Sequence, residues 1–505
     1  MRNFYYDVLK AIAIVAVVLY HLGVCKYGYL GVDVFLVIAG FFTLKSIYNQ
    51  VVKGFWEGVW RFVVNRVFRL WPLLLFSGTV CLAWGWMMML PDDFENLAQS
   101  VVATNLFGNN ILQAITTKNY WDVVNEYKPL MHTWYVGLLM QFYIIVPLLL
   151  FTIGRFVKDI NHRKIVNLSL LFLIGIFSLI MYFFSENVAA KFYYLPYRLY
   201  EFCTGGLVFC LFEKKPDSKS SNRVANMLFV ITYIVIIGFL FADMEYISDQ
   251  LKLLFTVILT ALLLVLMPRM QIAQGKVFSN KWIAVIGAAS FSIFVWHQVI
   301  LAFIRYSFTN NLTGIVPLLF FMVITAMLSV VSYKYIEQKK WGWMLIGLFF
   351  MSSTGMSLYV YKNAGVVRDV PELEVIKGKV HKGMWAEYCD RGYQYDKEFS
   401  DADIQKWYVI GNSFGRDMVN IILESQIINF VEVVYSDMHS YQDKKERFTA
   451  ADVVFLSTLG VDEKVSKTSV LVVLLVLGFL LLGRKILEKT MGRCIVIDLR
   501  KIIIR

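Results

Sequence analysis

Long apolar runs separated by short polar loops make up the hydrophobic pattern of this chain. A bilayer core of about 30 Å requires roughly 20 apolar residues in a helix, and the pattern predicts eleven membrane-spanning helices on that measure. We expect them at 7–24, 28–46, 70–90, 134–154, 165–184, 195–212, 226–242, 251–267, 283–304, 313–333 and 342–361. The uncharged stretch at 468–483 gives only about 24 Å of helix and is a marginal twelfth span. The first helix is expected to be a retained signal anchor.

Lysines and arginines gather in alternate loops, and this asymmetry predicts the orientation of the chain. With a cytoplasmic N-terminus, the cytoplasmic loops hold Lys45, Lys53, Arg61, Arg66 and Arg69; Arg155, Lys158, Arg163 and Lys164; Lys214, Lys215, Lys219 and Arg223; Arg269, Lys276 and Lys281; and Lys334, Lys339 and Lys340. The opposite loops are poor in lysine and arginine. An odd number of spans then places the segment after residue 362 outside the membrane.

That segment changes in character. Its apolar runs shorten to strand length at 407–410, 430–434 and 453–456 and alternate with expected helices, which predicts a small α/β domain. The expected fold is therefore an all-α polytopic membrane bundle at 1–362, a small extracytoplasmic α/β domain at 363–467, and an apolar segment with a basic tail at 468–505.

The composition supports a membrane protein and excludes other classes. Hydrophobic residues make up 58% of the chain and charged residues 17%, which is too little polar surface for a soluble globule of this length. The formal net charge is +12, but no segment combines dense basic residues with exposed aromatics, so we expect no nucleic-acid partner. The six cysteines form no CxxC pair and indicate neither a disulfide framework nor a metal site.

Three of the six histidines lie in or beside the predicted spans: His21, His132 and His297. A polar group in hydrocarbon is costly, so each is a candidate functional residue. Three other ionisable residues are expected near the same depth, namely Asp33, Arg198 and Glu201. A carboxylate such as Asp33 would hold a histidine in one tautomer, as a general base requires. The alternative is an ion-pair network that only orients the bundle.

Cations mark the other end of the predicted bundle. Lys10 lies eleven residues before His21, about 16 Å along one helix, so the two cannot touch and instead indicate a path across the bilayer. Arg66 and Arg69 are one turn apart and suit bidentate phosphate binding, as coenzyme A would need. By charge alone these three residues also fit a snorkelling lysine and ordinary positive-inside arginines.

These residues occur in motifs that resemble the membrane acyltransferase-3 family over residues 1 to about 340. The motifs are Lys10 with His21, Arg66-x-x-Arg69, His132-Thr133-Trp134 followed by Gln141-Phe142-Tyr143, and Ser290-Phe291-Ser292 before Trp296-His297. The resemblance implies an O-acetyltransferase of the bacterial inner membrane that moves acetyl from acetyl-CoA to a surface glycan, such as a capsular or lipid-linked O-antigen sugar. One position departs: Leu139 stands where the family usually has a glutamate.

The resemblance also implies roles for the candidate residues. Lys10, Arg66 and Arg69 would hold the phosphates of acetyl-CoA, and no metal or permanently bound cofactor is expected. His21, oriented by Asp33, would activate the acceptor or relay the acetyl group. The residues that would line the site are His132, His297, Glu201 and Trp296. The expected partners are acetyl-CoA, the glycan acceptor, the lipid bilayer and polysaccharide-assembly proteins.

The predicted outer domain resembles an incomplete SGNH hydrolase. The run Val409-Ile410-Gly411-Asn412-Ser413 presents a serine at the end of a strand, with Asn412 in place of the family's aspartate. His439 is the only histidine after Ser413, and its position does not fit the family's Asp-x-x-His block. Without a base Ser413 is a poor nucleophile. We therefore expect a non-hydrolytic domain that holds the acceptor, or a chain altered at its C-terminus.

A transporter is the competing interpretation, because polar residues near the middle of the bilayer would equally serve a proton-coupled substrate path. The sequence shows neither an inverted repeat nor paired helices broken by glycine or proline, which favours the enzyme. Hydrolysis or exchange of acetyl-CoA by the purified protein would separate the two.

The orientation is testable with reporter fusions. A reporter after Leu358 or Lys362 should register as extracytoplasmic and one near Lys215 as cytoplasmic, because the basic loops stay inside. Reversed signals would contradict both the topology and a donor bound from the cytoplasm.

Overall fold

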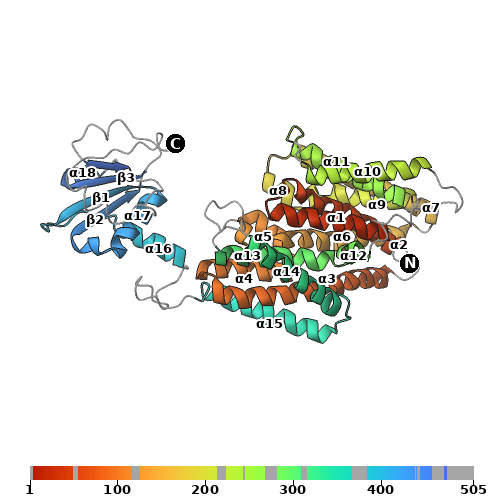
Figure 1. The fold of residues 1–505 in the computed structure, drawn as a ribbon, viewed down its shortest axis with the longest axis horizontal. Helices are drawn as coiled ribbons and strands as arrows, with labels where there is room; N and C mark the ends of the chain where they lie inside the picture. Colours follow the sequence, from red (N-terminus) through yellow and green to blue (C-terminus); the bar gives the residue numbers. More distant parts are fainter. Residues whose placement is uncertain are drawn as a thin grey trace. The chain divides into compact units, whose positions relative to one another are not determined.

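The computed structural model describes residues 4–48, 55–116, 125–157, 159–212, 223–242, 245–267, 281–308, 315–366, 384–437, 440, 444–457 and 471–474. The chain divides into two compact units, Met1–Lys362 and Asn363–Arg505. The first is a helical bundle and the second contains a β-sheet (Figure 1).

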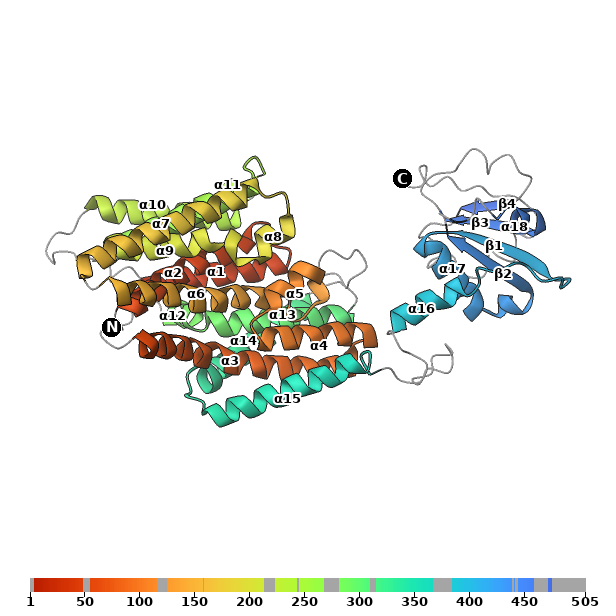
Figure 2. The same cartoon turned by 180° about the vertical axis from the view of Figure 1, so that it is seen from behind.

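The first unit consists of helices joined by short connections. They are α1 (Phe4–His21), α2 (Gly31–Tyr48), α3 (Phe55–Met88), α4 (Pro91–Asn105), α5 (Asn109–Thr116), α6 (Trp134–Phe156), α7 (Ile160–Phe184), α8 (Val188–Tyr193), α9 (Leu199–Phe212), α10 (Arg223–Phe241), α11 (Asp249–Leu266), α12 (Lys281–Ala288), α13 (Ser290–Phe308), α14 (Ile315–Ser332), a π-helical turn (Tyr333–Glu337) and α15 (Trp343–Lys362). Short 3₁₀ turns lie at Gly28–Leu30, Asn125–Tyr127, Met131–Thr133 and Leu195–Tyr197. Figures 1 and 2 show α15 at one edge of the bundle beside α3 and α4, and α10 with α11 at the opposite edge.

The chain is a polytopic membrane protein, but the predicted number of spans is wrong. Among the described residues eight helices are long and apolar enough to cross a membrane: α2, α3, α6, α7, α10, α11, α14 and α15. The pair α12–α13 makes a ninth if it counts as one span, although its two helices meet at 72°. Eleven spans were expected.

Length and charge account for the difference. Helix α9 has 14 residues, about 21 Å, which is short of a bilayer core of about 30 Å. Asp7 and Lys10 interrupt the apolar run in the first two turns of α1. The segment expected to span at 283–304 is broken between Ala288 and Ser290. In addition, α3 begins at Phe55, so Arg61, Arg66 and Arg69 lie on a helix of 34 residues and not in a loop.

The bundle is apolar on its outside and polar within, as a membrane protein requires. Large side chains on its outer helices are exposed, for example Phe177 at 65%, Ile234 at 64% and Val323 at 63%. Many ionisable and amide side chains are instead buried, including Asp33, His132, Arg198, Glu201, His297 and Gln298. Polar groups therefore gather between the helices.

Glycines bring α2 and α9 into backbone contact. A Cβ atom on Gly205 would lie 1.9 Å from the Val37 carbonyl oxygen, and one on Gly40 would lie 2.0 Å from that of Phe202. Small residues allow this close approach in membrane helices. It sets the distance at which the polar side chains on the two helices meet.

The second unit contains a four-stranded parallel sheet. Its elements are α16 (Met384–Tyr393), β1 (Gln405–Gly411), α17 (Ser413–Glu424), a 3₁₀ turn (Gln426–Asn429), β2 (Val431–Asp437), α18 (Lys445–Ala450), β3 (Val453–Ser457) and β4 (Leu471–Leu474). The strand order is β2-β1-β3-β4 (Figure 2). Tyr408 pairs with Val434 on one side and with Val454 on the other. The central strand is therefore buried, as its apolar sequence requires.

The stretch considered as a marginal twelfth span contributes to this sheet. Leu471–Leu474 pairs with β3 in parallel, so these residues are in a strand and not in a membrane helix. The rest of 468–483, the basic tail and His439 lie outside the described residues.

Close packing of α2 on α9 predicts a large effect of a single methyl group. Gly205→Ala should lower the apparent melting temperature of the detergent-purified protein by several degrees, because its Cβ would overlap the Val37 carbonyl. Gly238→Ala on α10 is the matched control, since nothing lies within 4 Å of its Cβ position. This control should be neutral or stabilising by up to about 1 kcal/mol. Equal melting temperatures for the two variants would contradict the packing.

Candidate functional site

Three histidines from separate parts of the chain meet at one end of the bundle. His21 is the last residue of α1, His132 lies in the turn before α6, and His297 is in the middle of α13. The ring centroids of His21 and His297 are 5.2 Å apart, and those of His132 and His297 are 5.4 Å apart. His132 and His297 are buried, at 2% and 0% exposure. We call these three residues the histidine cluster.

The hydrogen bonds of the cluster leave a ring nitrogen available. The Nδ1 atom of His297 lies 3.2 Å from the Ile293 carbonyl oxygen. A carbonyl only accepts, so in the neutral ring Nδ1 carries the proton and Nε2 carries the lone pair. Nε2 of His297 has no hydrogen-bond partner among the described residues, whereas the ring of His132 lies beside the backbone of Pro129 and Val295. A buried imidazole with an open lone pair is the arrangement that a general base needs.

A polar network beyond His297 holds the cluster together. Gln298 donates from Nε2 to the carbonyls of Glu126 and Lys128, both at 3.3 Å. Arg305 donates to the carbonyls of Glu126 at 3.1 Å and His21 at 2.9 Å. These bonds tie α13 to the end of α1 and to the segment that leads into His132. Gln298 and Arg305 are not among the residues expected from the sequence, although Gln298 is a polar residue inside an apolar span.

The expectation that Asp33 orients His21 is corrected by the structure. Asp33 and Arg198 are both buried and pair at 2.5 Å, and Arg198 lies 3.2 Å from Glu201. The two carboxylates and the guanidinium form one cluster between α2 and α9, held by the glycine packing described above. Asp33 is thus an ion-pair partner of Arg198, and Glu201 belongs to the same group and not to the histidine cluster. This is the ion-pair network that the sequence left open as an alternative for these residues.

Arg69 faces a carboxylate that the sequence analysis missed. The Arg69 guanidinium lies 3.9 Å from Glu337, whose other oxygen accepts a hydrogen bond of 2.9 Å from the Ser292 hydroxyl. The Glu337 side chain is 4% exposed, whereas that of Arg69 is 55% exposed. Glu337 ends a π-helical turn, a local geometry that often marks functional sites. Its signal in the sequence was a carboxylate four residues after the end of a predicted span, among lysines.

The other expected cations have different neighbours. The Arg66 guanidinium lies over the rings of Phe62 and Tyr143, at 5.0 Å and 4.9 Å from their centroids. Lys10 is 3.8 Å from Asp7 and lies over the Phe42 ring; it also interacts electrostatically with Glu337. Lys10 and Arg69 therefore act on the same carboxylate, whereas Arg66 is stacked between aromatic rings.

Helix α13 carries one residue of the Arg69–Glu337–Ser292 group and one residue of the histidine cluster. Ser292 and His297 are five residues apart on α13, about 7.5 Å along its axis. Trp296 connects α13 to neighbouring helices, since its indole donates to the Ser332 hydroxyl at 2.8 Å and its ring contacts Phe76. An accessible cation and a set of imidazoles thus lie within reach of one extended substrate.

In the second unit, Ser413 is the first residue of α17, directly after β1 and the capping residue Asn412. The Asn412 side chain accepts from the Phe414 amide at 3.0 Å. The charged groups of this unit gather around Arg447, which bonds to Asp396 and Glu398. Burial raises the pKa of Asp396, but hydrogen bonds from Arg447 and Lys444 outweigh it and hold the pKa below its ordinary value. These ion pairs do not include Ser413, whose role stays a prediction.

Comparison with known proteins identifies the first unit. Residues 3–334 match the model of the acyltransferase 3 family, described as an acyltransferase domain. The match ends before the second unit, so the likeness of that unit to SGNH hydrolases stays a prediction. No solved structure matches the chain.

Curated relatives are similar over about two thirds of this chain. The chain is 27% identical to the "Putative membrane-bound transacylase BcsY" of Komagataeibacter xylinus over 66% of this chain and 81% of that protein. It is 23% identical to the peptidoglycan O-acetyltransferase OatA of Listeria monocytogenes, over 66% of this chain and 54% of the relative. It is 26% identical to a "Putative O-acetyltransferase" of Staphylococcus aureus, over 66% and 56%. The chain thus covers only about half the length of the two O-acetyltransferases.

Proposed function

Because the chain belongs to the acyltransferase 3 family and is therefore a membrane enzyme that transfers acyl groups, we propose that it moves acetyl from acetyl-CoA to a hydroxyl of a cell-surface glycan. The observation that carries the proposal is the contact of His21, His132 and His297 about 7.5 Å along α13 from the Arg69–Glu337–Ser292 group. The family membership sets aside the transporter. Relatives named as O-acetyltransferases support oxygen as the acceptor atom.

The donor would bind at the Arg69 end. Arg69 is the more accessible guanidinium of the Arg66/Arg69 pair and would bind a coenzyme A phosphate, with Lys10 nearby. An anionic phosphate would compete with Glu337 for Arg69. The pantetheine arm would then run along α13 and place the thioester near the histidine cluster. Positive-inside loops support entry of the donor from the cytoplasm of a bacterial cell.

The transfer requires one proton to move twice. A histidine lone pair, for which Nε2 of His297 is the best oriented, would accept the proton of the acceptor hydroxyl as its oxygen attacks the thioester carbonyl. The C–S bond breaks, the new C–O ester bond remains, and the imidazolium returns the proton to the thiolate. His21 and His132 would share in this proton transfer or hold the acceptor oxygen.

The histidine cluster is tested by substitution. His21→Ala and His297→Ala should each lower glycan O-acetylation by about 10²–10⁴-fold, the usual cost of losing a positioned acid or base. His162→Ala is the control, because His162 is exposed and pairs with Asp159, the residue just before α7. Acetyl content is measured by NMR of the purified glycan, with membrane abundance checked by immunoblot. Full activity of both cluster variants would make these histidines packing residues.

Donor binding is tested on α3. Arg69→Gln should raise the KM for acetyl-CoA by about tenfold or more and change kcat less, because a charge-assisted hydrogen bond to phosphate is lost. Arg61→Gln, two turns earlier on the same helix, removes an exposed arginine paired with Glu57 and should leave KM unchanged. The assay follows release of the coenzyme A thiol. An equal KM in both variants would place the donor elsewhere.

A further inference from the structure

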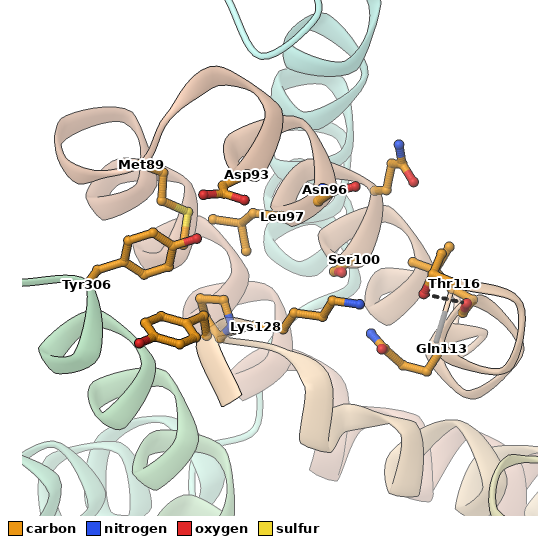
Figure 3. Close-up of a pocket in the computed structure, with 13 residues that line it drawn as sticks. Met89, Asp93, Asn96, Leu97, Ser100, Gln113, Thr116, Lys128 and Tyr306 are labelled. Carbon is orange, nitrogen blue, oxygen red and sulfur yellow. Dashed lines mark hydrogen bonds between the residues drawn. The ribbon is translucent and has the colours of Figure 1, made fainter. Parts of the chain in front are cut away.

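A hollow of about 440 Å³ lies at the histidine end of the first unit (Figure 3). Helix α4 lines it with residues at positions i, i+3, i+4 and i+7, which share one helix face: Asp93, Asn96, Leu97 and Ser100. Helix α5, the segment 127–129 and the end of α13 complete the wall. This volume includes the open solvent at the mouth, and the enclosed space is much smaller, so an occupant of the hollow would lie partly exposed.

The lining is rich in groups that bind hydroxyls. Asn96, Gln99 and Gln113 offer amides that both donate and accept, and Thr116 and Ser100 offer hydroxyls. A sugar hydroxyl is likewise both donor and acceptor, so amides and hydroxyls match it in either role. Figure 3 shows Asp93 at one end of the pocket, Gln113 at the other, and the Lys128 side chain extended between them. One carboxylate and one ammonium cancel in charge and do not select an ionic ligand.

Two tyrosines supply the apolar part of the wall. The rings of Tyr127 and Tyr306 meet edge to face with centroids 5.5 Å apart. Such side chains present a flat apolar surface with a polar tip, which suits the C–H face of a sugar ring. The second hollow of the unit differs: it is lined by Pro72, Leu75, Phe76, Ile336, Trp341, Ile346 and Phe349, with no side chain that could hold a polyol.

The pocket is tied to the histidine cluster. The segment that lines it, 127–129, continues into His132, and Gln298 next to His297 donates to the Lys128 carbonyl. Tyr306 lies nine residues beyond His297 on α13, about 13 Å along the axis. Ser292 and Arg69 lie on the other side of His297. The pocket is therefore on the side of the histidines away from the proposed donor site, and too far from them for its occupant to be the acetylated ring.

We propose that this pocket is an acceptor subsite that binds an uncharged, hydroxyl-rich sugar unit of the glycan, beyond the unit that is acetylated. The inference rests on the proposed function. It makes the enzyme one that selects a chain of sugars and not a single sugar.

The test distinguishes an effect on acceptor binding from an effect on the reaction of the donor. The double variant Asn96→Leu/Gln99→Leu removes two half-buried amides at similar volume, and Gln250→Leu on α11 is the matched control. Detergent-purified proteins are assayed for release of coenzyme A without acceptor. Transfer is then measured to de-O-acetylated fragments of the source strain's own surface glycan, of one repeating unit or of several.

The wild type and Gln250→Leu should show a KM about tenfold lower for the longer fragments, the scale expected for a few added hydrogen bonds. The double variant should lose this difference and keep coenzyme A release within about twofold of wild type. Asn96→Gln, which keeps an amide, should preserve part of the preference.

Two results would overturn the subsite: an unchanged preference for long fragments in the double variant, or a loss of coenzyme A release equal to the loss of transfer, which would show that these amides do not act on the acceptor alone. A wild-type protein that neither releases coenzyme A nor acetylates any fragment would instead reject the proposed function, and so distinguishes the two failures.

Discussion

The buried cluster of Asp33, Arg198 and Glu201 is the interaction on which the arrangement of the bundle depends. Removing one partner of such a cluster leaves an uncompensated charge away from water, at a cost of about 3–5 kcal/mol. The cluster forms only because Gly40 and Gly205 let α2 and α9 touch along their backbones. Helix α2 is in turn packed close to α1, where a Cβ on Gly31 would lie 2.4 Å from the Ala13 carbonyl. The position of His21 at the end of α1 thus depends on ion pairing at α2, the helix packed against it.

This dependence separates the ionisable groups into two kinds. Asp33, Arg198 and Glu201 neutralise one another as ion pairs and serve packing. The histidines do not satisfy one another, since Nε2 of His297 has no hydrogen-bond partner among the described residues. Polar groups that remain unsatisfied in a buried site need a reason to be there. A substrate that supplies the missing partners during transfer is such a reason, and it explains why the imidazoles lie apart from the ion pairs.

Much of this arrangement was predictable from the sequence. The remaining features were not predictable, for physical reasons. Apolar runs predict a membrane bundle because each residue of a helix contributes its own free energy of transfer into hydrocarbon, and these contributions can be summed from the sequence. The partner of Asp33 was not predictable, because Asp33 and Arg198 are 165 residues apart and only the packing of α2 on α9 decides it. Glu337 escaped notice because it lies between Lys334 and Lys339, where charged residues indicate a loop. Leu471–Leu474 was ambiguous because a short apolar run suits a buried strand as well as a helix.

Helix α13 shows how one element can position the groups for a reaction of two substrates. Its break from α12 at Ala288 turns the chain by 72°, so α13 begins within the bundle with Ser292 beside Glu337. His297 follows after one and a half turns, and Tyr306 after two and a half more. A rigid helix fixes these spacings, whereas loops would let them vary. If donor and acceptor bind on opposite sides of His297, the thioester and the hydroxyl can meet only at the imidazoles, which keeps water-exposed parts of both substrates away from the reacting carbonyl.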